Sequence, residues 1–312
     1  MKKSLYFTLI FALALFALAG CGNGNPTASQ NKESSSDPIV VGTKYHTESY
    51  ILSKITALYL KEKGYKIEEA GQMGGQLSRK ALENNQIDIY WDYTGTALVN
   101  YLKQDPISDS KKAYELLAKM DKEKNNIIWL SPAAFNNTFA LLLKKEKAQE
   151  LGIESISDLA AYINKNPETL TFGTNAEFAG RPDGLKGIEK AYGFKFGSKN
   201  VKQMETGLPI QALHNGEVDV AVAYSTDGRI KAYNLKSLTD DKVYFPAYNG
   251  VVTTRADVLE QYPELDKELK PIVDKLDDET ITDLNYQVDY EKKSVEEVAK
   301  QWLVQNGFMK SN

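Results

Sequence analysis

Short β-rich runs alternate with helical patterns along most of the chain. Residues 39–43 predict a buried strand, and the apolar residues of 47–63 recur at helical spacing until Gly64. The pattern then predicts a helix over 76–85 and a strand over 87–91. Strands that alternate with helices in this way indicate an α/β protein.

The same order of elements returns in the second half of the chain, beginning with a predicted strand at 170–174. Gly-Thr occurs at 42–43 and again at 173–174, and Ala-Leu occurs at 81–82 and again at 212–213. Both repeats are 131 positions apart, and unrelated segments rarely keep one offset across two motifs. The sequence therefore predicts two lobes of the same topology.

The segment 257–308 is mostly helical by the spacing of its apolar residues, and we expect it to cover the first lobe.

Each lobe places a tyrosine after the matching strand. Tyr93 follows the strand at 87–91, and Tyr224 lies 131 positions later in the second lobe. Ligands bind outside the carboxyl ends of the strands in open α/β sheets. We therefore expect the two tyrosines to face each other across a cleft, although each could also be a half-buried tyrosine at a strand end.

The first twenty residues have the order of a secretory signal peptide. Two lysines follow the initiating Met, an apolar stretch spans 5–19, and Cys21 comes directly after Leu-Ala-Gly. This resembles the bacterial lipobox, in which the cysteine is lipidated. The alternatives are an ordinary signal peptide with a chance cysteine and a retained membrane helix, for which the apolar stretch is short. Residues 21–37 are then the lipidated Cys and a flexible tether.

Composition excludes several classes of protein. Lys+Arg number 38 against 42 Asp+Glu, so the chain lacks the basic surplus that a nucleic-acid partner requires. One Cys excludes an intramolecular disulfide and a thiolate zinc cluster, and two His leave little room for a metal site. An exported domain has no access to cytosolic ATP or NAD(P)H, and the chain has no P-loop. We expect neither a metal nor a cofactor.

The sequence also lacks the groups that catalysis needs. Nucleophilic catalysis requires a base beside the nucleophile, and His46 and His214 are the only imidazoles. His214 lies in a helix-to-strand turn and is expected at the surface. No pair of carboxylates indicates a glycosidase. The chain is therefore predicted to be a binding protein and not an enzyme.

Aromatic rings at a cleft suit two classes of ligand. Sugars stack on rings, and quaternary ammonium ions are attracted to ring faces by about 0.5–2 kcal/mol for each contact. Sugars would also require many Asp, Asn and Arg side chains beside the rings.

Four motifs carry a resemblance to a known family. They are Trp-Asp-Tyr-Thr-Gly-Thr at 91–96, Asn-Asn-Thr-Phe-Ala-Leu at 136–141, Glu-Phe-Ala-Gly-Arg-Pro-Asp-Gly at 177–184 and Ala-Tyr-Gly-Phe at 191–194. In this order they resemble the osmoprotectant-binding lipoproteins of ABC importers, which bind glycine betaine, carnitine, choline or proline betaine. The resemblance implies a type II periplasmic-binding-protein fold, with two lobes, two crossover strands and a ligand cleft between the lobes. We then expect the first lobe to comprise residues 38–136 and 246–312, and the second lobe to comprise residues 137–245.

In that family four tyrosines form a cage around the ammonium group. The resemblance assigns three of these positions to Tyr93, Tyr224 and Tyr248. The remaining position is Phe139, so the sequence departs from the pattern by losing one hydroxyl while it keeps the ring face.

The family also holds a carboxylate of the ligand with a basic residue, a threonine and an arginine. The resemblance assigns these roles to Lys44, Thr96 and Arg181. The two cations and Thr96 favour betaines over choline, which has no carboxylate.

The resemblance thus implies a monomeric, lipid-anchored receptor on the extracellular face of the cell membrane. It would capture a quaternary-ammonium osmoprotectant, glycine betaine first among them, and deliver it to ABC permease subunits. Three alternatives remain: a binding protein of the same fold for amino acids or polyamines, a secreted hydrolase, and a purely structural lipoprotein.

Overall fold

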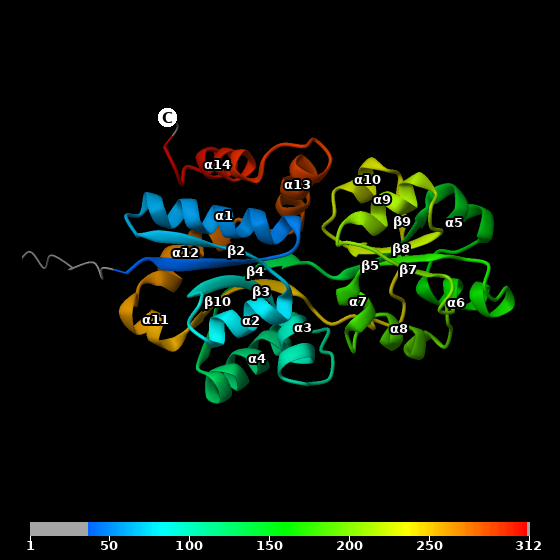
Figure 1. The fold of residues 1–312 in the computed structure, drawn as a ribbon, viewed down its shortest axis with the longest axis horizontal. Coiled ribbons are helices and arrows are strands. Elements are labelled where there is room, and N and C mark those ends of the chain that lie inside the picture. The colour runs from blue at the N-terminus through cyan, green and yellow to red at the C-terminus, as the bar shows by residue number, and fades with distance from the viewer. Residues whose placement is uncertain (1–36, 311–312) are drawn as a thin grey trace, which may run out of the picture. The chain divides into compact units, whose positions relative to one another are not determined.

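Two five-stranded sheets with helices on both sides make up residues 37–310, the part of the protein that the computed structural model describes (Figure 1). The predicted signal peptide and Cys21 lie outside these residues. Within residues 37–310, no helix combines the length and the apolar character needed to cross a membrane.

The first sheet has the strand order β2-β1-β3-β10-β4. Three strands run parallel, namely β1 (Ile39–Lys44), β2 (Ile67–Met73) and β3 (Ile89–Tyr93). β10 (Asn249–Arg255) lies antiparallel between β3 and β4 (Ile127–Asn136). The predicted strand at 87–91 therefore begins two residues later and includes Tyr93 as its last residue.

The second sheet has the order β7-β6-β8-β5-β9. β6 (Phe172–Thr174) pairs in parallel with β7 (Val201–Gln203) and β8 (Val220–Tyr224). β5 (Phe139–Lys144) lies antiparallel between β8 and β9 (Leu235–Ser237). The predicted strand at 170–174 is shorter than expected, because only its last three residues pair.

The two sheets share one topology, which confirms the prediction of two similar lobes. Three parallel strands are followed by an antiparallel strand in each sheet, and β8 repeats β3 at the offset of 131 residues. The same hydrogen bond recurs at that offset. Asp88 accepts from the backbone N–H of Val40 at 2.7 Å, and Asp219 accepts from that of Thr171 at 2.8 Å.

The helices that follow the strands complete each lobe. Those of the first lobe are α1 (Thr47–Glu62), α2 (Gly75–Glu83), α3 (Thr94–Thr96), the π-helical turn η1 (Ala97–Tyr101) and α4 (Ser110–Asn125). Those of the second lobe are α5 (Lys145–Leu151), α6 (Ile156–Lys165), α7 (Ala176–Gly180), α8 (Leu185–Tyr192), α9 (Leu208–Asn215) and α10 (Arg229–Ala232).

The helix α1 buries the apolar residues whose spacing predicted it. Its apolar residues Ile51 and Ile55 are fully buried, as expected for the inner stripe of an amphipathic helix. The helix ends one residue before Lys63, and Gly64 has a φ of +90°, a conformation that favours glycine. The predicted stop at this glycine is confirmed.

The C-terminal part consists of four helices. They are α11 (Ala256–Gln261), α12 (Leu265–Val273), α13 (Asp278–Asp289) and α14 (Val295–Gln305). Both α13 and α14 pack against α1 (Figure 1).

The chain passes between the two sheets twice. It leaves the first sheet after Asn136 and enters the second at Phe139, and it returns between Ser237 and Asn249. These two crossings, together with the carboxyl ends of β1, β3 and β8, bring residues of both lobes to one place.

Candidate functional site

All seven site residues predicted from the sequence line one small cavity. They are Lys44, Tyr93, Thr96, Phe139, Arg181, Tyr224 and Tyr248. The cavity has a volume of about 20 Å³, which is about enough for one water molecule. Three further residues that the sequence did not indicate also line it, namely His46, Asn137 and Glu177.

The topology explains why these residues converge. Lys44, Tyr93 and Tyr224 are the last residues of β1, β3 and β8, and such strand ends are where open α/β sheets bind ligands. Phe139 is the first residue of β5 and the cross-strand partner of Tyr224. Tyr248 lies directly before β10 at the return crossing.

The aromatic rings pack on one another. The rings of Phe139 and Tyr224 are stacked with centroids 5.2 Å apart, and Tyr248 approaches Phe139 edge-on at 5.5 Å. His46 contacts both paired tyrosines, with its ring 5.8 Å from Tyr93 and 5.5 Å from Tyr224. An imidazole therefore packs against the two tyrosines that the repeat had predicted to face each other.

A glycine makes room for Tyr248. A Cβ atom on Gly95 would lie 2.9 Å from the ring of Tyr248 and 2.8 Å from the carbonyl oxygen of Ala247. Both distances are shorter than carbon atoms tolerate. The Thr-Gly-Thr segment after β3 thus needs its glycine so that the ring can occupy its place.

Lys44 carries a charge that is already balanced inside the protein. Its ammonium group forms an ion pair with Asp92, which is fully buried, and lies 5.1 Å from the centroid of the Tyr93 ring. The cation therefore covers one of the ring faces that the resemblance assigns to a ligand.

Arg181 is balanced in the same way. Its guanidinium donates two hydrogen bonds to Asp183, at 2.8 and 2.7 Å, and a third to Thr96 at 3.2 Å. Its central carbon lies 5.3 Å from the ring centroid of Phe139 and 5.4 Å from that of Tyr248. Because Asp183 is 1% exposed, this pair is desolvated, and the arginine has less net charge to offer a ligand carboxylate than the sequence suggested.

Glu48 is a buried carboxylate beside the candidate site that the sequence did not indicate. It lies in the first turn of α1 and is 3% exposed. Its carboxylate accepts hydrogen bonds from the following four side chains: Tyr93 at 2.7 Å, Asn137 at 2.7 Å, Thr226 at 2.7 Å and Asn285 at 3.2 Å. Burial raises the pKa of this carboxyl group, and these hydrogen bonds oppose that effect. The sequence signal that could have indicated Glu48 is its position in the turn after β1, close to Lys44 at the end of that strand.

His46 is held as a neutral imidazole. Its Nδ1 accepts a hydrogen bond from the backbone N–H of Ser49 at 3.3 Å, which caps the start of α1. Burial, followed by the nearby charge of Lys44, lowers the pKa of His46 from 6.5 to about 3. His214, by contrast, is exposed as predicted and stacks on Tyr233.

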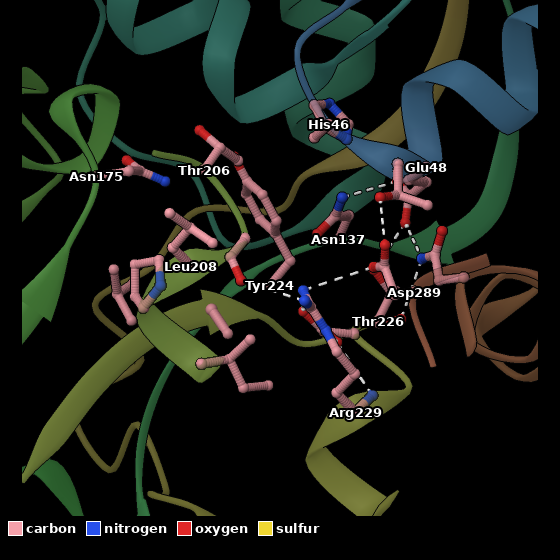
Figure 2. Close-up of a pocket in the computed structure, with 18 of the residues that line it drawn as sticks. His46, Glu48, Asn137, Asn175, Thr206, Leu208, Tyr224, Thr226, Arg229 and Asp289 are labelled. Carbon is pink, nitrogen blue, oxygen red and sulfur yellow. Dashed lines mark hydrogen bonds and ion pairs between the residues drawn. The ribbon is translucent and has the colours of Figure 1, made fainter. Parts of the chain in front are cut away.

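A second and larger cavity, of about 240 Å³, adjoins the first. The two share His46, Asn137, Phe139 and Tyr224 in their linings. The larger one is also lined by Glu48, Thr226, Arg229 and Asp289, and by residues around the start of α9 (Figure 2). Asn285 lines it as well. Its walls combine these polar side chains with apolar residues, among them Leu208, Ile210 and Val222.

The described part of the chain offers no site for a metal ion. Among residues 37–310, no group of three or more His, Cys, Asp and Glu side chains is arranged to bind one.

Comparison with known proteins identifies the family. The family described as the substrate binding domain of ABC-type glycine betaine transport systems matches residues 37–305. A glycine-betaine-binding protein of Pseudomonas aeruginosa is 39% identical over 268 residues, which cover 84% of this chain and 86% of that protein. An ergothioneine transport permease/ergothioneine binding protein of Helicobacter pylori is 37% identical over 272 residues, 86% of this chain and 48% of that protein, so this chain spans about half its length.

A solved structure supports the same assignment. The crystal structure of a glycine betaine/carnitine/choline ABC transporter is 33% identical, with a TM-score of 0.71 over 86% of this chain and 99% of that one. This likeness confirms the predicted two-lobed periplasmic-binding-protein fold. The family consists of binding proteins of transporters, so the prediction that the chain is not an enzyme is also confirmed. The chain belongs to the family of substrate-binding domains of ABC-type glycine betaine transport systems.

Proposed function

We propose that this protein captures a quaternary-ammonium compound in an aromatic cage formed by Tyr93, Phe139, Tyr224 and Tyr248. The observation that carries the proposal is that the four rings line one cavity together with Lys44, Thr96 and Arg181. A trimethylammonium group has no N–H to donate, so ring faces are its natural partners. Glycine betaine, carnitine, choline and proline betaine are the candidate ligands.

Ligand entry requires side chains to move. The cage cavity has room for about one water molecule, and the cations of Lys44 and Arg181 lie over its ring faces. A trimethylammonium group would take over those faces once the two cations withdraw, or once the two lobes separate. In the liganded state, Arg181, Lys44 and Thr96 would hold a carboxylate of the ligand.

A second ligand class has a specific observation in its favour. The Helicobacter pylori relative, 37% identical, is named as an ergothioneine binding protein, and ergothioneine also carries a trimethylammonium group beside a carboxylate. The larger cavity beside the cage has the volume to receive the ring of such a ligand.

We further propose that the protein is a monomeric lipoprotein. Lipidated at Cys21, it would remain at the extracellular face of the cell membrane on the tether of residues 21–37 and deliver its ligand to ABC permease subunits. We also propose the lobe boundaries at residues 136 and 246, because the chain crosses between the two sheets at 137–138 and 238–248. Replacement of Cys21 by Ser should release the protein from membranes and abolish incorporation of labelled palmitate, whereas unchanged membrane attachment would contradict the anchor.

The ligand proposal is tested by titration of the purified protein with glycine betaine, carnitine, choline, ergothioneine and, as a control, proline. Calorimetry detects binding, and tryptophan fluorescence reports it because Trp91 lies two residues before Tyr93 on β3. We expect saturable binding of at least one quaternary-ammonium ligand and none of proline. Tyr93→Ala and Tyr224→Ala should each weaken binding at least tenfold. Absence of binding by all four quaternary-ammonium ligands would overturn the proposal.

A further inference from the structure

Two amide side chains are held in one orientation by the buried carboxylate of Glu48. The Nδ2 atoms of Asn137 and Asn285 donate to its two oxygens, at 2.7 and 3.2 Å, and Asn285 also donates to the carbonyl oxygen of Thr226. Turning either amide over would place its oxygen against the carboxylate, which repels it. The carbonyl oxygens of Asn137 and Asn285 therefore cannot exchange places with their NH₂ groups.

Both of these carbonyl oxygens are buried acceptors without a donor. Only four buried side-chain polar atoms within residues 37–310 lack a hydrogen-bond partner, and Oδ1 of Asn137 and Oδ1 of Asn285 are two of them. Each of the two residues is 4% exposed. An unsatisfied buried acceptor is costly, and native structures satisfy most of them. Two such acceptors around one carboxylate indicate a site that receives donors.

These acceptors belong to residues beside the proposed cage. Asn137 lines both the cage cavity and the larger cavity (Figure 2). Asn285 lines the larger one. The larger cavity is lined by one cation, Arg229, which pairs with Asp227 and Asp289, and by a third carboxylate, Glu48, so carboxylates outnumber cations in its lining. What the larger cavity offers a ligand is therefore mainly hydrogen-bond acceptance.

We infer that the ligand carries a hydrogen-bond donor, a hydroxyl or a ring N–H, in addition to its quaternary ammonium group. This inference rests on the proposed function. With the ammonium group in the cage, the donor lies in the larger cavity and bonds to the carbonyl oxygens of Asn137 and Asn285. Glycine betaine has no such donor, so it fills only the cage. Asn137 and Asn285 determine specificity, and Glu48 positions them.

Matched ligands test this inference on the unaltered protein. Carnitine and deoxycarnitine differ only by one hydroxyl, and histidine betaine differs from its ring N-methyl derivative only by the N–H. Calorimetry should show at least one donor-bearing ligand binding about tenfold more tightly than its partner, the worth of a buried hydrogen bond. Equal affinities within both pairs would overturn the inference. This is the result expected if water molecules, and not the ligand, donate to the two carbonyl oxygens.

Variants separate this role from a structural one. Asn137→Ala and Asn285→Ala remove a carbonyl acceptor and should bring the affinity ratio of the matched pair close to one. Thr226→Val removes a different donor to Glu48 while it leaves both carbonyls, so it should lower both affinities together and keep the ratio. If Asn285→Ala leaves the affinity ratio of the matched pair unchanged, Asn285 does not accept a hydrogen bond from the ligand.

The same titrations distinguish failure of this inference from failure of the proposed function. If glycine betaine binds and neither matched pair shows a preference, the inference fails and the proposed function stands. If no quaternary-ammonium ligand binds, the proposed function itself fails.

Discussion

The hydroxyl of Thr226 donates a hydrogen bond of 2.7 Å to the carboxylate of Glu48. Glu48 lies in α1 beside the first sheet, and Thr226 follows the last residue of β8 in the second sheet by two positions. This contact therefore joins the two lobes through a buried acid. It lies beside the cage, because Tyr93 donates to the same carboxylate.

Loss of this carboxylate should destabilise the protein. Glu48→Ala removes an acceptor shared by four buried donors, and we expect the free energy of unfolding to fall by about 2–3 kcal/mol. Urea unfolding measures the change. Glu296→Ala, which removes an exposed ion pair with Lys300, is the control and should cost less than about 0.5 kcal/mol. Equal effects of the two substitutions would contradict the role of Glu48.

The raised pKa of Glu48 gives a pH dependence with a defined sign. Burial raises this pKa above 4.5, so the folded state binds the proton more tightly than the unfolded state. The stability contributed by this group is fully present below pH 4.5 and is lost as pH rises through the raised pKa. Glu48→Gln cannot ionise, so its unfolding free energy relative to wild type should increase between pH 4 and pH 7. A difference that stays constant over this range would contradict the prediction.

His46 should produce the opposite dependence. Burial and the charge of Lys44 lower its pKa from 6.5 to about 3, so its contribution is present above pH 6.5 and is lost as pH falls toward 3. The loss is at most about 1.4 kcal/mol for each pH unit. His46→Gln should therefore gain in stability relative to wild type as the pH is lowered. His214→Gln changes an exposed histidine and leaves His46 in place, so it is the matched control. Urea unfolding between pH 4 and pH 7 should show the gain relative to wild type in His46→Gln, and a gain of the same size in His214→Gln would contradict the role of His46.

Gly95 should control affinity through Tyr248. A methyl group at this position would displace the Tyr248 ring, and we expect Gly95→Ala to weaken ligand binding by about 0.5–2 kcal/mol, the worth of one cation–π contact. Gly71→Ala introduces the same methyl group where nothing lies within 4 Å. Calorimetry should give wild-type affinity for Gly71→Ala, and an equal affinity for Gly95→Ala would show that the ring does not contribute.

Asp183 should set the preference between zwitterionic and cationic ligands. Asp183→Asn keeps the shape of the side chain but leaves the charge of Arg181 less balanced. Attraction of a ligand carboxylate then increases, and we expect the preference for glycine betaine over choline to rise by about tenfold or more. Asp257→Asn removes a carboxylate from an exposed ion pair outside the cavity linings and should leave the preference unchanged. An unchanged preference in Asp183→Asn would mean that Arg181 does not meet the carboxylate.

The sequence by itself determined the two lobes and two rings of the candidate cage, Tyr93 and Tyr224, because their local patterns recur at one offset. Phe139 and Tyr248 followed only from the resemblance to the family. Asp88 and Asp219 each bind the strand beside them, 131 residues apart, and Tyr93 and Tyr224 end equivalent strands at the same offset. Parallel strands place their carboxyl ends at one edge of each sheet. Residues that the sequence places at such strand ends therefore also lie close together in space.

Only the tertiary structure decided how the charges and amides of the site are used. Glu48 meets Thr226 and Asn285 although they lie 178 and 237 positions away in the sequence, and no periodicity links such distant segments. In the same way, the pairing of Lys44 with Asp92 depends on the packing of β1 against β3. The physical reason is that hydrogen bonding and desolvation in a buried site are fixed by which side chains pack together, and that is settled only when the lobes have folded against each other.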